Sequence, residues 1–506
     1  METLCKQLGV YRNEMKREFA FPWEVKVQLV KEKNFGNEWN TYRMFVIEDN
    51  QDNLRKKEFE RLVTESGNIV FFDGNTIRAK GKVNDIEILK SDGNRDFTIA
   101  RLDRCIKNID TCKNVIVRKM LEAKIKHENP TLKIDREIPE LRKSSILAIE
   151  GCPGAGKSTL CSKLIRKYSS KYRFLYLAPT HEQIQNMLMK LENKGFDIVI
   201  MSDESKLNSQ MTKYHNSNRK GYSIKQKNVI PPDANIILST INKPLKGLSS
   251  LDKTIVVIDE AGKVSVIEAL AAIYMINKLV FLVLAGDSRQ LGCHSNNNTY
   301  IESCLEYVHR CDAEVWDLRN QFRFGQNINY PMSLLFYDGK MIPEEQKLSK
   351  LIYIEVIDCS HEKQMSCRVE AGVVKTIFDH IKDSYQTQVI TPYIKQQECL
   401  ETFGISALSI DGSQGSEFEA TIVSLGRNSG RGFLTKQRLN VAFTRSALLL
   451  FIIAHADLRK SIPEVQIIYQ VAKINDNIVY FRSKSKCTRE SSTARIQVRS
   501  GRCSHS

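Results

Sequence analysis

The sequence predicts an α/β protein with two parallel sheets in tandem, and three observations lead to this fold class. Residues 146–160 read as a short apolar strand, a glycine-rich turn and the start of a helix. Residues 254–260 read as an apolar strand that ends in two carboxylates. Further apolar strands, each ending in small or polar residues, alternate with helical patterns across both halves of residues 144–460, which is typical of parallel sheets.

The composition is that of a long, basic chain. Its 506 residues exceed what one hydrophobic core usually serves, so several domains are expected. A net charge of +16, from 75 Lys and Arg against 59 Asp and Glu, favours a polyanionic partner such as nucleic acid. No apolar run approaches the ~20 residues that span a bilayer, the first residues are charged, and the 13 cysteines are scattered. We therefore expect a cytoplasmic or nuclear protein, neither secreted nor bound to a membrane.

The glycine-rich turn matches G-x-x-x-x-G-K-[ST], the pattern of a phosphate-binding P-loop. A phosphate chain is densely anionic, so it needs inward-facing backbone N–H groups above a helix N-terminus, which glycines allow by close approach. Lys157 is expected to reach the β- and γ-phosphates, and the Ser158 hydroxyl to bind Mg²⁺. The residues assigned to nucleotide binding here are Gly151, Gly154, Ala155, Gly156, Lys157, Ser158 and Thr159.

The acidic strand end supplies the other half of this chemistry. Asp259, at the end of the strand Ile255–Ile258, would share the Mg²⁺ shell with Ser158. Glu260 would orient or deprotonate the attacking water. Together with the P-loop, these residues predict a chain that binds a nucleoside triphosphate with Mg²⁺ and hydrolyses it.

The second half of the chain has strands but no second P-loop. Its apolar runs cover residues 388–393, 407–410, 420–425 and 448–454. Arg323 and Arg445 lie beside strand ends in this half. We interpret this as one nucleotide shared across a cleft, whose closure brings in the arginines to stabilise the transition state. Taken singly, each arginine could instead belong to a surface ion pair.

Eight motifs in order resemble those of superfamily 1 helicases, in the branch of the nonsense-mediated-decay helicase and the nidovirus replicative helicases. The resemblance covers roughly residues 144–457 and is most specific at residues 318–341 and 432–446. It implies two tandem RecA-like domains, ATP as the nucleotide and 5′→3′ movement on a single strand. The motifs are GCPGAGKS, LAPTHEQ, IDEAG, AGDSRQLG, LRNQFRF, VITPY, DGSQGSEFEATIVSL and RLNVAFTR.

The resemblance also implies roles for particular residues. Gln290 would sense the γ-phosphate, and Arg323 and Arg445 would be arginine fingers. Phe322 takes the place of a tyrosine that stacks on adenine, while Gly415 and Glu417 would contact the nucleotide. The residues implied for the nucleic-acid channel are Pro179, Thr180, Thr240, Thr391, Pro392, Tyr393 and Gln414.

The chain departs from the family pattern at three places. Cys152 occupies a P-loop position where the family usually has proline, and Gly262-Lys263 follow the acidic pair where many relatives have a small residue and glutamine. Residues 131–136 show no clear L-N-x-x-Q segment, whose glutamine reads the adenine edge in relatives. The choice of ATP over other nucleoside triphosphates is therefore left open.

The pattern of strands and charges, together with this resemblance, predicts four regions. Residues 1–140 are an accessory region, with a β-barrel-like module at about 20–90 and a helical stalk at about 97–125. A first RecA-like domain covers residues 144–312 with a polar insertion at about 202–230, and a second covers 313–460. Residues 461–506 are a C-terminal segment with a basic, disordered tail from about 482. A zinc site among Cys293, His294, Cys304, His309 and Cys311 is disfavoured because no pair has the C-x₂-C spacing.

These features favour an NTP-dependent helicase that acts on single-stranded or partly duplex nucleic acid, working as a monomer. One alternative is a nucleic-acid-stimulated ATPase that clamps or remodels ribonucleoproteins without processive unwinding. Another is a binding scaffold with a vestigial NTPase, against which the intact Lys157, Asp259 and Glu260 argue. RNA or DNA as substrate, viral or cellular origin, and replication or RNA-processing proteins as partners stay open.

Overall fold

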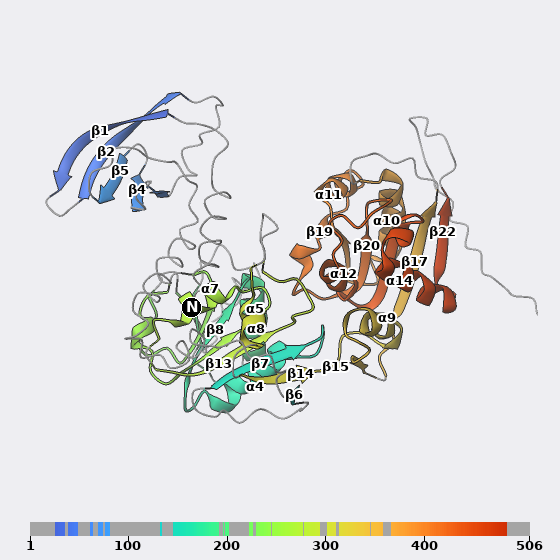
Figure 1. Cartoon of the computed structure of the whole chain (residues 1–506), viewed down its shortest axis with the longest axis horizontal. Coiled ribbons are helices and arrows are strands. Elements are labelled where there is room, and N and C mark those ends of the chain that lie inside the picture. Colours follow the sequence, from blue (N-terminus) through green and yellow to red (C-terminus); the bar gives the residue numbers. More distant parts are fainter. Residues whose placement is uncertain are drawn as a thin grey trace, which may run out of the picture.

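The computed structural model describes the two sheet domains almost completely, together with the strands that precede them (Figure 1). The predicted stalk at about 97–125 and the tail beyond 482 lie outside the described residues, as does most of the predicted insertion at about 202–230. The described residues are 26–35, 39–48, 61–63, 69–73, 76–80, 132–133, 145–191, 196, 198–201, 222–225, 229–243, 245–276, 278–293, 301–309, 313–344, 346–357 and 366–482.

The β-rich module predicted near the N-terminus is an antiparallel sheet with the strand order β1-β2-β5-β4-β3. Figure 1 shows it standing apart from the two parallel sheets. Residues 83–89, an apolar run within the predicted module, lie outside the described residues. Its strands are β1 (Lys26–Phe35), β2 (Trp39–Glu48), β3 (Arg61–Val63), β4 (Ile69–Asp73) and β5 (Thr76–Lys80).

The first parallel sheet has nine strands in the order β10-β9-β11-β8-β12-β13-β7-β14-β6. Alternate residues of its central strands point to two separate apolar clusters, one on each face, as a sheet covered on both sides requires. Its strands are β6 (Leu132–Lys133), β7 (Ser145–Gly151), β8 (Arg173–Ala178), β9 (Ile198–Met201), β10 (Tyr222–Lys225), β11 (Ile236–Thr240), β12 (Thr254–Ile258), β13 (Leu279–Gly286) and β14 (Glu314–Leu318). Its helices are α4 (Lys157–Tyr168), α5 (His181–Leu191), α7 (Val266–Ile273), α8 (Cys304–His309) and the short 3₁₀ turn η3 (Leu248–Ser250).

The second parallel sheet has six strands in the order β19-β18-β20-β21-β17-β22. Between the sheets, β15 (Asn320–Gln321) pairs with β16 (Ile342–Pro343). The strands of the second sheet are β17 (Lys350–Ile357), β18 (Thr387–Thr391), β19 (Ala407–Ser409), β20 (Phe418–Ser424), β21 (Ser446–His455) and β22 (Ile478–Arg482). The helices are α9 (Gln326–Phe336), α10 (Arg368–Ile381), α11 (Ile394–Glu401), η4 (Asp411–Ser413), α12 (Lys436–Phe443), α13 (Leu458–Ser461) and α14 (Pro463–Ile474).

Two boundaries differ from those that the sequence suggested. β14 was placed at the start of the second domain, but it pairs with β7 and so belongs to the first sheet. α14 and β22 were placed in a separate C-terminal segment, but β22 pairs with β17 and completes the second sheet. Both strands lie in the outer part of a sheet and pair with residues far away in the sequence. Their membership therefore depends on long-range pairing, which local patterns do not carry.

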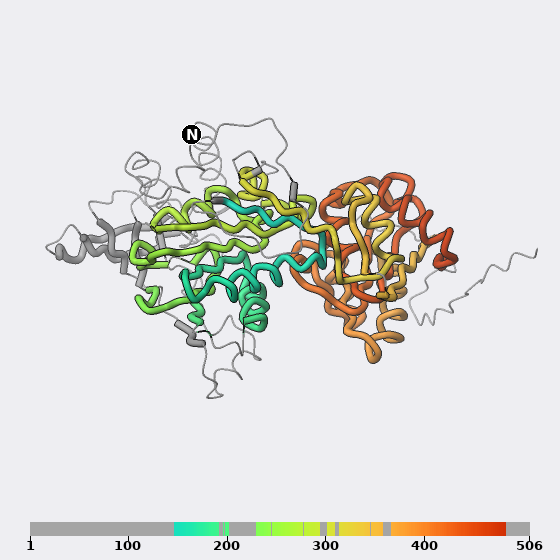
Figure 2. The backbone as a smooth tube through the Cα atoms, turned by 90° about the horizontal axis from the view of Figure 1, so that it is seen from below, coloured from blue at the N-terminus to red at the C-terminus, as the bar shows by residue number. Residues whose placement is uncertain are grey.

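The two sheet domains lie side by side and meet at the P-loop (Figure 2). Cys152 and Ala155 of this loop are buried in an apolar cluster that otherwise consists mainly of second-domain residues, including Phe324 and Phe443. The loop that would bind phosphates is thus packed against the neighbouring domain. None of the helices among the described residues is long and apolar enough to cross a membrane.

Candidate active site

The P-loop joins β7 to the start of α4 and is shaped by two glycines in the left-handed region. Gly154 has a φ of 76° and Gly156 a φ of 82°, where side chains are strained. A Cβ atom at Gly154 would come within 2.5 Å of the Cβ atom of Arg323. The Gly154 carbonyl accepts a hydrogen bond from the backbone N–H of Phe322 at 2.9 Å. The loop is therefore in direct backbone contact with the segment that carries the first arginine.

Lys157 and Cys152 show how the loop holds its shape. The Lys157 ammonium donates to the carbonyls of Gly151 at 2.8 Å and Cys152 at 3.2 Å, so it lies across the mouth of the loop. Cys152 is buried, and its Sγ lies 3.7 Å from the carbonyl oxygens of Leu318 and Arg319. Burial raises the pKa of the Cys152 thiol to about 12, which keeps it protonated and unreactive. The cysteine that replaces the family's proline therefore serves to fill space.

Asp259 lies at the end of β12 and gathers two hydroxyl groups on one carboxylate oxygen. Its Oδ2 accepts from Ser158 Oγ at 2.7 Å and from the Tyr176 hydroxyl at 2.6 Å. Burial, and secondarily the charge of Glu260, raises the pKa of Asp259, while both hydroxyl groups act in the opposite direction. A hydroxyl and a carboxylate side by side are the oxygen ligands that a hard divalent cation prefers, so Ser158 and Asp259 fit the metal site that the sequence predicts.

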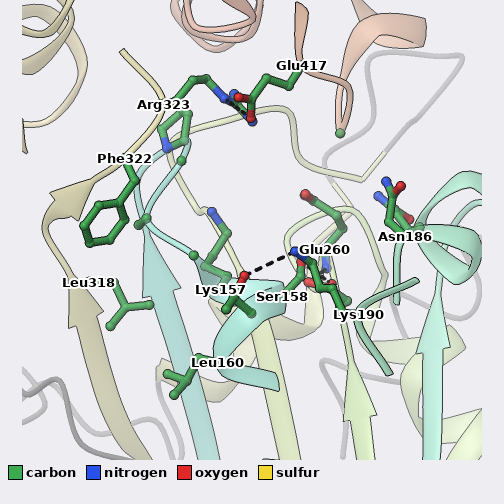
Figure 3. A pocket seen from close by; sticks show the side chains of 18 of the residues that line it. Lys157, Ser158, Leu160, Asn186, Lys190, Glu260, Leu318, Phe322, Arg323 and Glu417 are labelled. Carbon is green, nitrogen blue, oxygen red and sulfur yellow. Dashed lines mark hydrogen bonds and ion pairs between the residues drawn. The ribbon is translucent and has the colours of Figure 1, made fainter. Parts of the chain in front are cut away.

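Glu260 follows Asp259 with an unusual backbone. Its φ is 51°, a region in which non-glycine residues are uncommon and which often marks a functional turn. Its backbone N–H donates to Asp259 Oδ1 at 3.0 Å, so one carboxylate fixes the turn that presents the next. In Figure 3 Glu260 and Phe322 lie on opposite sides of the cleft.

Gln290 and Arg445 meet in the buried floor of the cleft. The Gln290 amide donates to Asp287 Oδ2 at 3.0 Å and its oxygen accepts from Arg445 at 3.4 Å. Burial, followed by the charge of Arg323, lowers the pKa of Arg445 to about 9. Only 2% of the Arg445 surface is exposed, yet the side chain stays charged at neutral pH because its pKa stays above 7. An incoming anion would relieve this poorly compensated charge.

Arg323 approaches the cleft from the second domain. Its Nε donates to Glu417 at 2.9 Å and its Nη1 to the Thr444 carbonyl at 2.7 Å, as Figure 3 shows in part. Phe322, one residue earlier, is 53% exposed and faces the cleft. An exposed aromatic ring at the rim is suited to stack on a base.

One cleft of about 1110 Å³ brings these residues together. Most of the residues that the sequence assigned to the nucleotide line it, while Gly151 lies beneath the loop and is buried. The predicted residues that line the cleft are Gly154, Ala155, Gly156, Lys157, Ser158, Thr159, Asp259, Glu260, Gln290, Phe322, Arg323, Gly415, Glu417 and Arg445.

The residues assigned to the nucleic-acid channel lie outside this cleft lining. Thr391 and Tyr393 are buried, and the Tyr393 hydroxyl accepts from Arg427 at 3.0 Å. Thr180 starts α5 by exchanging hydrogen bonds with Gln183, which is a helix-capping role. The structure thus places these residues at or beside the ends of strands and helices. The other members of the set are Pro179, Thr240, Pro392 and Gln414.

The cysteine and histidine cluster considered for zinc is only partly described. Cys304 is buried on α8 and its Sγ donates to the Ala261 carbonyl at 3.2 Å. His294 and Cys311 lie outside the described residues. Within the described ranges, no group of three or more His, Cys, Asp or Glu side chains is placed to hold a metal ion.

Sequence reasoning missed four buried side chains that hold the site. Tyr176 holds Asp259, whereas Asp287, Tyr337 and Asn440 form a hydrogen-bonded group beside Gln290. Asp287 lies inside a recognised motif, and a tyrosine in the middle of an apolar strand needs a partner for its hydroxyl, so both carried a signal. Tyr337 and Asn440 carried none, because their partners lie 50 and 103 residues away in the chain.

Comparisons with known proteins agree with this geometry. Two family models, both described as AAA domain, match residues 139–302 and 300–457. The DNA replication ATP-dependent helicase/nuclease DNA2 of Saccharomyces cerevisiae is 23% identical over 391 residues, which is 64% of this chain and 26% of that protein. An uncharacterized ATP-dependent helicase of Methanocaldococcus jannaschii is 26% identical over 274 residues, which is 46% of this chain and 41% of that protein. The chain thus spans between a quarter and two fifths of these relatives.

Two solved structures of viral helicases are also similar. Arterivirus nonstructural protein 10 (helicase) in complex with DNA is 18% identical, with a TM-score of 0.43, over 77% of this chain and 72% of that chain. The PRRSV helicase is 16% identical, with a TM-score of 0.41, over 78% of this chain and 63% of that chain. The paired AAA-domain matches and the curated relatives support an ATP-dependent helicase-type NTPase related to superfamily 1.

Proposed function

We propose that this protein is an ATP-dependent helicase that moves 5′→3′ along a single strand and unwinds duplex nucleic acid. One observation carries the proposal. The cleft takes its P-loop and acidic strand end from the first sheet domain, and Arg323 and Arg445 from the second. A nucleotide between them would contact both domains, so hydrolysis and domain movement would be coupled.

The positions of the residues in the cleft support a separate role for each of them in hydrolysis. Lys157 and the N-terminus of α4 would bind the phosphates, and Glu260 would accept a proton from the attacking water. Mg²⁺ held by Ser158 and Asp259 would neutralise charge on the β- and γ-phosphates. Arg323 and Arg445 would stabilise the charge of the transition state. For this, Arg323 would exchange Glu417 for a phosphate oxygen, which is a local rearrangement.

Nucleic acid is the polymer that best fits the charge of the chain. Its net charge of +16 would attract a phosphate backbone largely independently of sequence. Alternate closing and opening of the cleft would then shift one domain along the strand relative to the other. RNA and DNA present the same backbone charge, so the choice between them requires a direct test.

The first test measures ATP hydrolysis by the purified protein alone, with single-stranded RNA and with single-stranded DNA. We expect one or both polymers to stimulate turnover. Tailed duplexes with a 5′ or a 3′ single strand then test direction, and we expect only the 5′-tailed duplex to be separated. Stimulated hydrolysis with every duplex left intact would favour a ribonucleoprotein clamp or remodeller over a helicase.

Nucleotide choice is the second test. Stacking on Phe322 would hold any base, because every base offers an aromatic face. Turnover with ATP, GTP, CTP and UTP should therefore differ by less than about tenfold, since stacking alone discriminates weakly. A strong preference for ATP would show that another group reads the adenine edge.

A further inference from the structure

Five buried polar side chains connect the two sheet domains directly beneath the cleft. We call Asp287, Gln290, Tyr337, Asn440 and Arg445 the interdomain polar chain. Asp287 and Gln290 follow β13 of the first sheet, Tyr337 ends α9, Asn440 lies in α12, and Arg445 follows α12. All five have at most 6% of their surface exposed, so none of their hydrogen bonds is shared with bulk solvent.

Each hydrogen bond in the interdomain polar chain has a fixed direction. The Asn440 amide donates to the Tyr337 hydroxyl at 2.9 Å, and that hydroxyl donates to Asp287 Oδ2 at 2.7 Å. From the other side, Arg445 donates to the Gln290 oxygen at 3.4 Å and the Gln290 amide donates to the same Asp287 oxygen at 3.0 Å. Both halves of the interdomain polar chain therefore end on Asp287 Oδ2. The orientation of the Gln290 amide depends on its hydrogen bond to this oxygen, which also accepts from Tyr337.

The Tyr337 hydroxyl connects the second domain directly to Asp287. The Asn440 amide also donates to the Arg289 carbonyl at 2.9 Å, so α12 is held both to Tyr337 and to the loop after β13. Among the described residues, the Asn440 oxygen has no hydrogen-bond partner, so this amide is held by its donors alone. Loss of the Tyr337 hydroxyl would leave a buried carboxylate and a buried amide short of a partner each.

The rim of the same contact has a different character. Arg289 pairs with Asp338 at 3.0 Å, but these side chains are 41% and 67% exposed. An exposed ion pair contributes little, and salt screens it. The interdomain polar chain beneath it differs, because its directional hydrogen bonds are buried and are not screened, so they fix the relative position of the domains at this point.

We propose that Tyr337 is a positioning residue whose hydroxyl links the γ-phosphate-sensing loop at Gln290 to the helix that presents Arg445, so that both groups engage the nucleotide together. This inference rests on the proposed ATPase cycle of the cleft. It adds a coupling element that touches neither nucleotide nor nucleic acid. In the absence of the hydroxyl, nucleotide would still bind to the P-loop, but only the 3.4 Å bond between Gln290 and Arg445 would hold the two side chains together, so they would reach the phosphate together less often.

The test compares Tyr337→Phe with a matched control, Tyr353→Phe. Tyr353 is a fully buried tyrosine of β17, and its hydroxyl has no hydrogen-bond partner among the described residues. Both variants remove one buried hydroxyl and keep the ring. Measurements are the Kd of an ATP analogue in the presence of Mg²⁺, kcat and KM for ATP, and the Tm. Asn440→Ala and the double variant Tyr337→Phe/Asn440→Ala complete a double-mutant cycle.

For Tyr337→Phe we expect kcat to fall about tenfold or more, equal to at least about 1.4 kcal/mol of transition-state stabilisation, with Kd changed less than about twofold. Tyr353→Phe should change neither. Asn440→Ala should also lower kcat, and adding it to Tyr337→Phe should lower kcat by a smaller factor than Asn440→Ala alone does, because the bond between the two residues is then already lost and only the bond to the Arg289 carbonyl remains to be removed.

Three results would overturn the inference. They are a Tyr337→Phe kcat within twofold of the Tyr353→Phe control, a loss confined to Tm, or fully multiplicative effects of the two substitutions. The kcat of each variant is expressed as a ratio to the wild-type kcat measured with the same nucleic acid. If the wild type hydrolyses ATP without any stimulation by nucleic acid, the helicase proposal fails while this ratio still decides the role of Tyr337.

Discussion

The two halves of the cleft are organised in different ways. In the first sheet domain, Ser158, Tyr176 and Asp259 hold one another at 2.6–2.7 Å, so the metal-side geometry exists before any ligand arrives. In the second domain, Arg323 is occupied by Glu417 and by a backbone carbonyl. One half is therefore prepared to bind, whereas the other must release an existing partner to act. This difference separates nucleotide affinity from turnover, and substitutions in the two halves should affect different constants.

The largest effect should follow from the first half. Lys157→Ala removes the cation that lies across the P-loop mouth and would reach the β- and γ-phosphates. We expect ATP hydrolysis to fall to background with each polymer, measured as phosphate release at saturating ATP. Turnover close to wild type would rule out the assigned nucleotide site. Lys171→Ala, an exposed lysine beyond the end of α4, is the matched control.

A loss of turnover with binding intact should follow from the second half. Arg445→Ala should cut kcat by ~10³-fold or more, the range seen for loss of an arginine finger. The Kd for the nucleotide should stay nearly constant, because the P-loop is untouched. A weakened Kd with normal kcat would instead place Arg445 in ground-state binding. Arg431→Ala is a suitable control, because Arg431 pairs with Glu464 away from the cleft.

A smaller effect should isolate the metal side. Tyr176→Phe removes one of two hydroxyl groups that hold Asp259, without altering the ring. Because groups that orient a metal ligand commonly account for about 10- to 100-fold in affinity, we expect a rise of about tenfold in the Mg²⁺ concentration at half-maximal activity. Thermal stabilisation by Mg²⁺ and nucleotide should shift to higher metal concentration in parallel. An unchanged metal dependence would show that Ser158 and the Glu260 backbone N–H are sufficient to fix the carboxylate.

The smallest effect on turnover is expected for a buried carboxyl group of the second domain, Glu370, which should affect the pH dependence of stability instead. Burial raises the pKa of Glu370 from 4.5 to about 8, although Ser424 and the Gly426 N–H donate to it. Because the folded state then binds the proton more tightly than the unfolded state, stability falls as the pH rises from about 4.5 to about 8. Glu370→Gln should remove this slope, at most about 1.4 kcal/mol per pH unit.

Chemical unfolding at pH 5, 6.5 and 8 would measure this slope in the wild type and in Glu370→Gln. ATP turnover at neutral pH should change less than about twofold, since Glu370 lies outside the cleft lining. If the free energy of unfolding changed with pH in the same way in both proteins, Glu370 would not titrate in this range.

The sequence alone could predict the parts of the site that are contiguous in the chain, but not those that the fold brings together. Both P-loop and acidic strand end are contiguous in the chain, so residue type and spacing alone indicated Lys157, Asp259 and their roles. Tyr176 and Tyr337 are joined to their partners over 83 and 50 residues, and only the fold brings these atoms within hydrogen-bonding distance. β14 and β22 were assigned to the wrong units for the same reason, because strand pairing is set by tertiary contacts.

The contact between Gly154 and Phe322 also determines where movement of the two domains would be centred. The chain leaves the first sheet at Leu318, which pairs with Gly151, and four residues later the Phe322 N–H is bonded to the P-loop. A pivot at this point would lie beside the phosphates themselves. In a rigid rotation, displacement grows with distance from the axis, so a small change of angle would barely disturb the bound nucleotide. The remote faces of both domains would travel much farther, as the ends of a lever do.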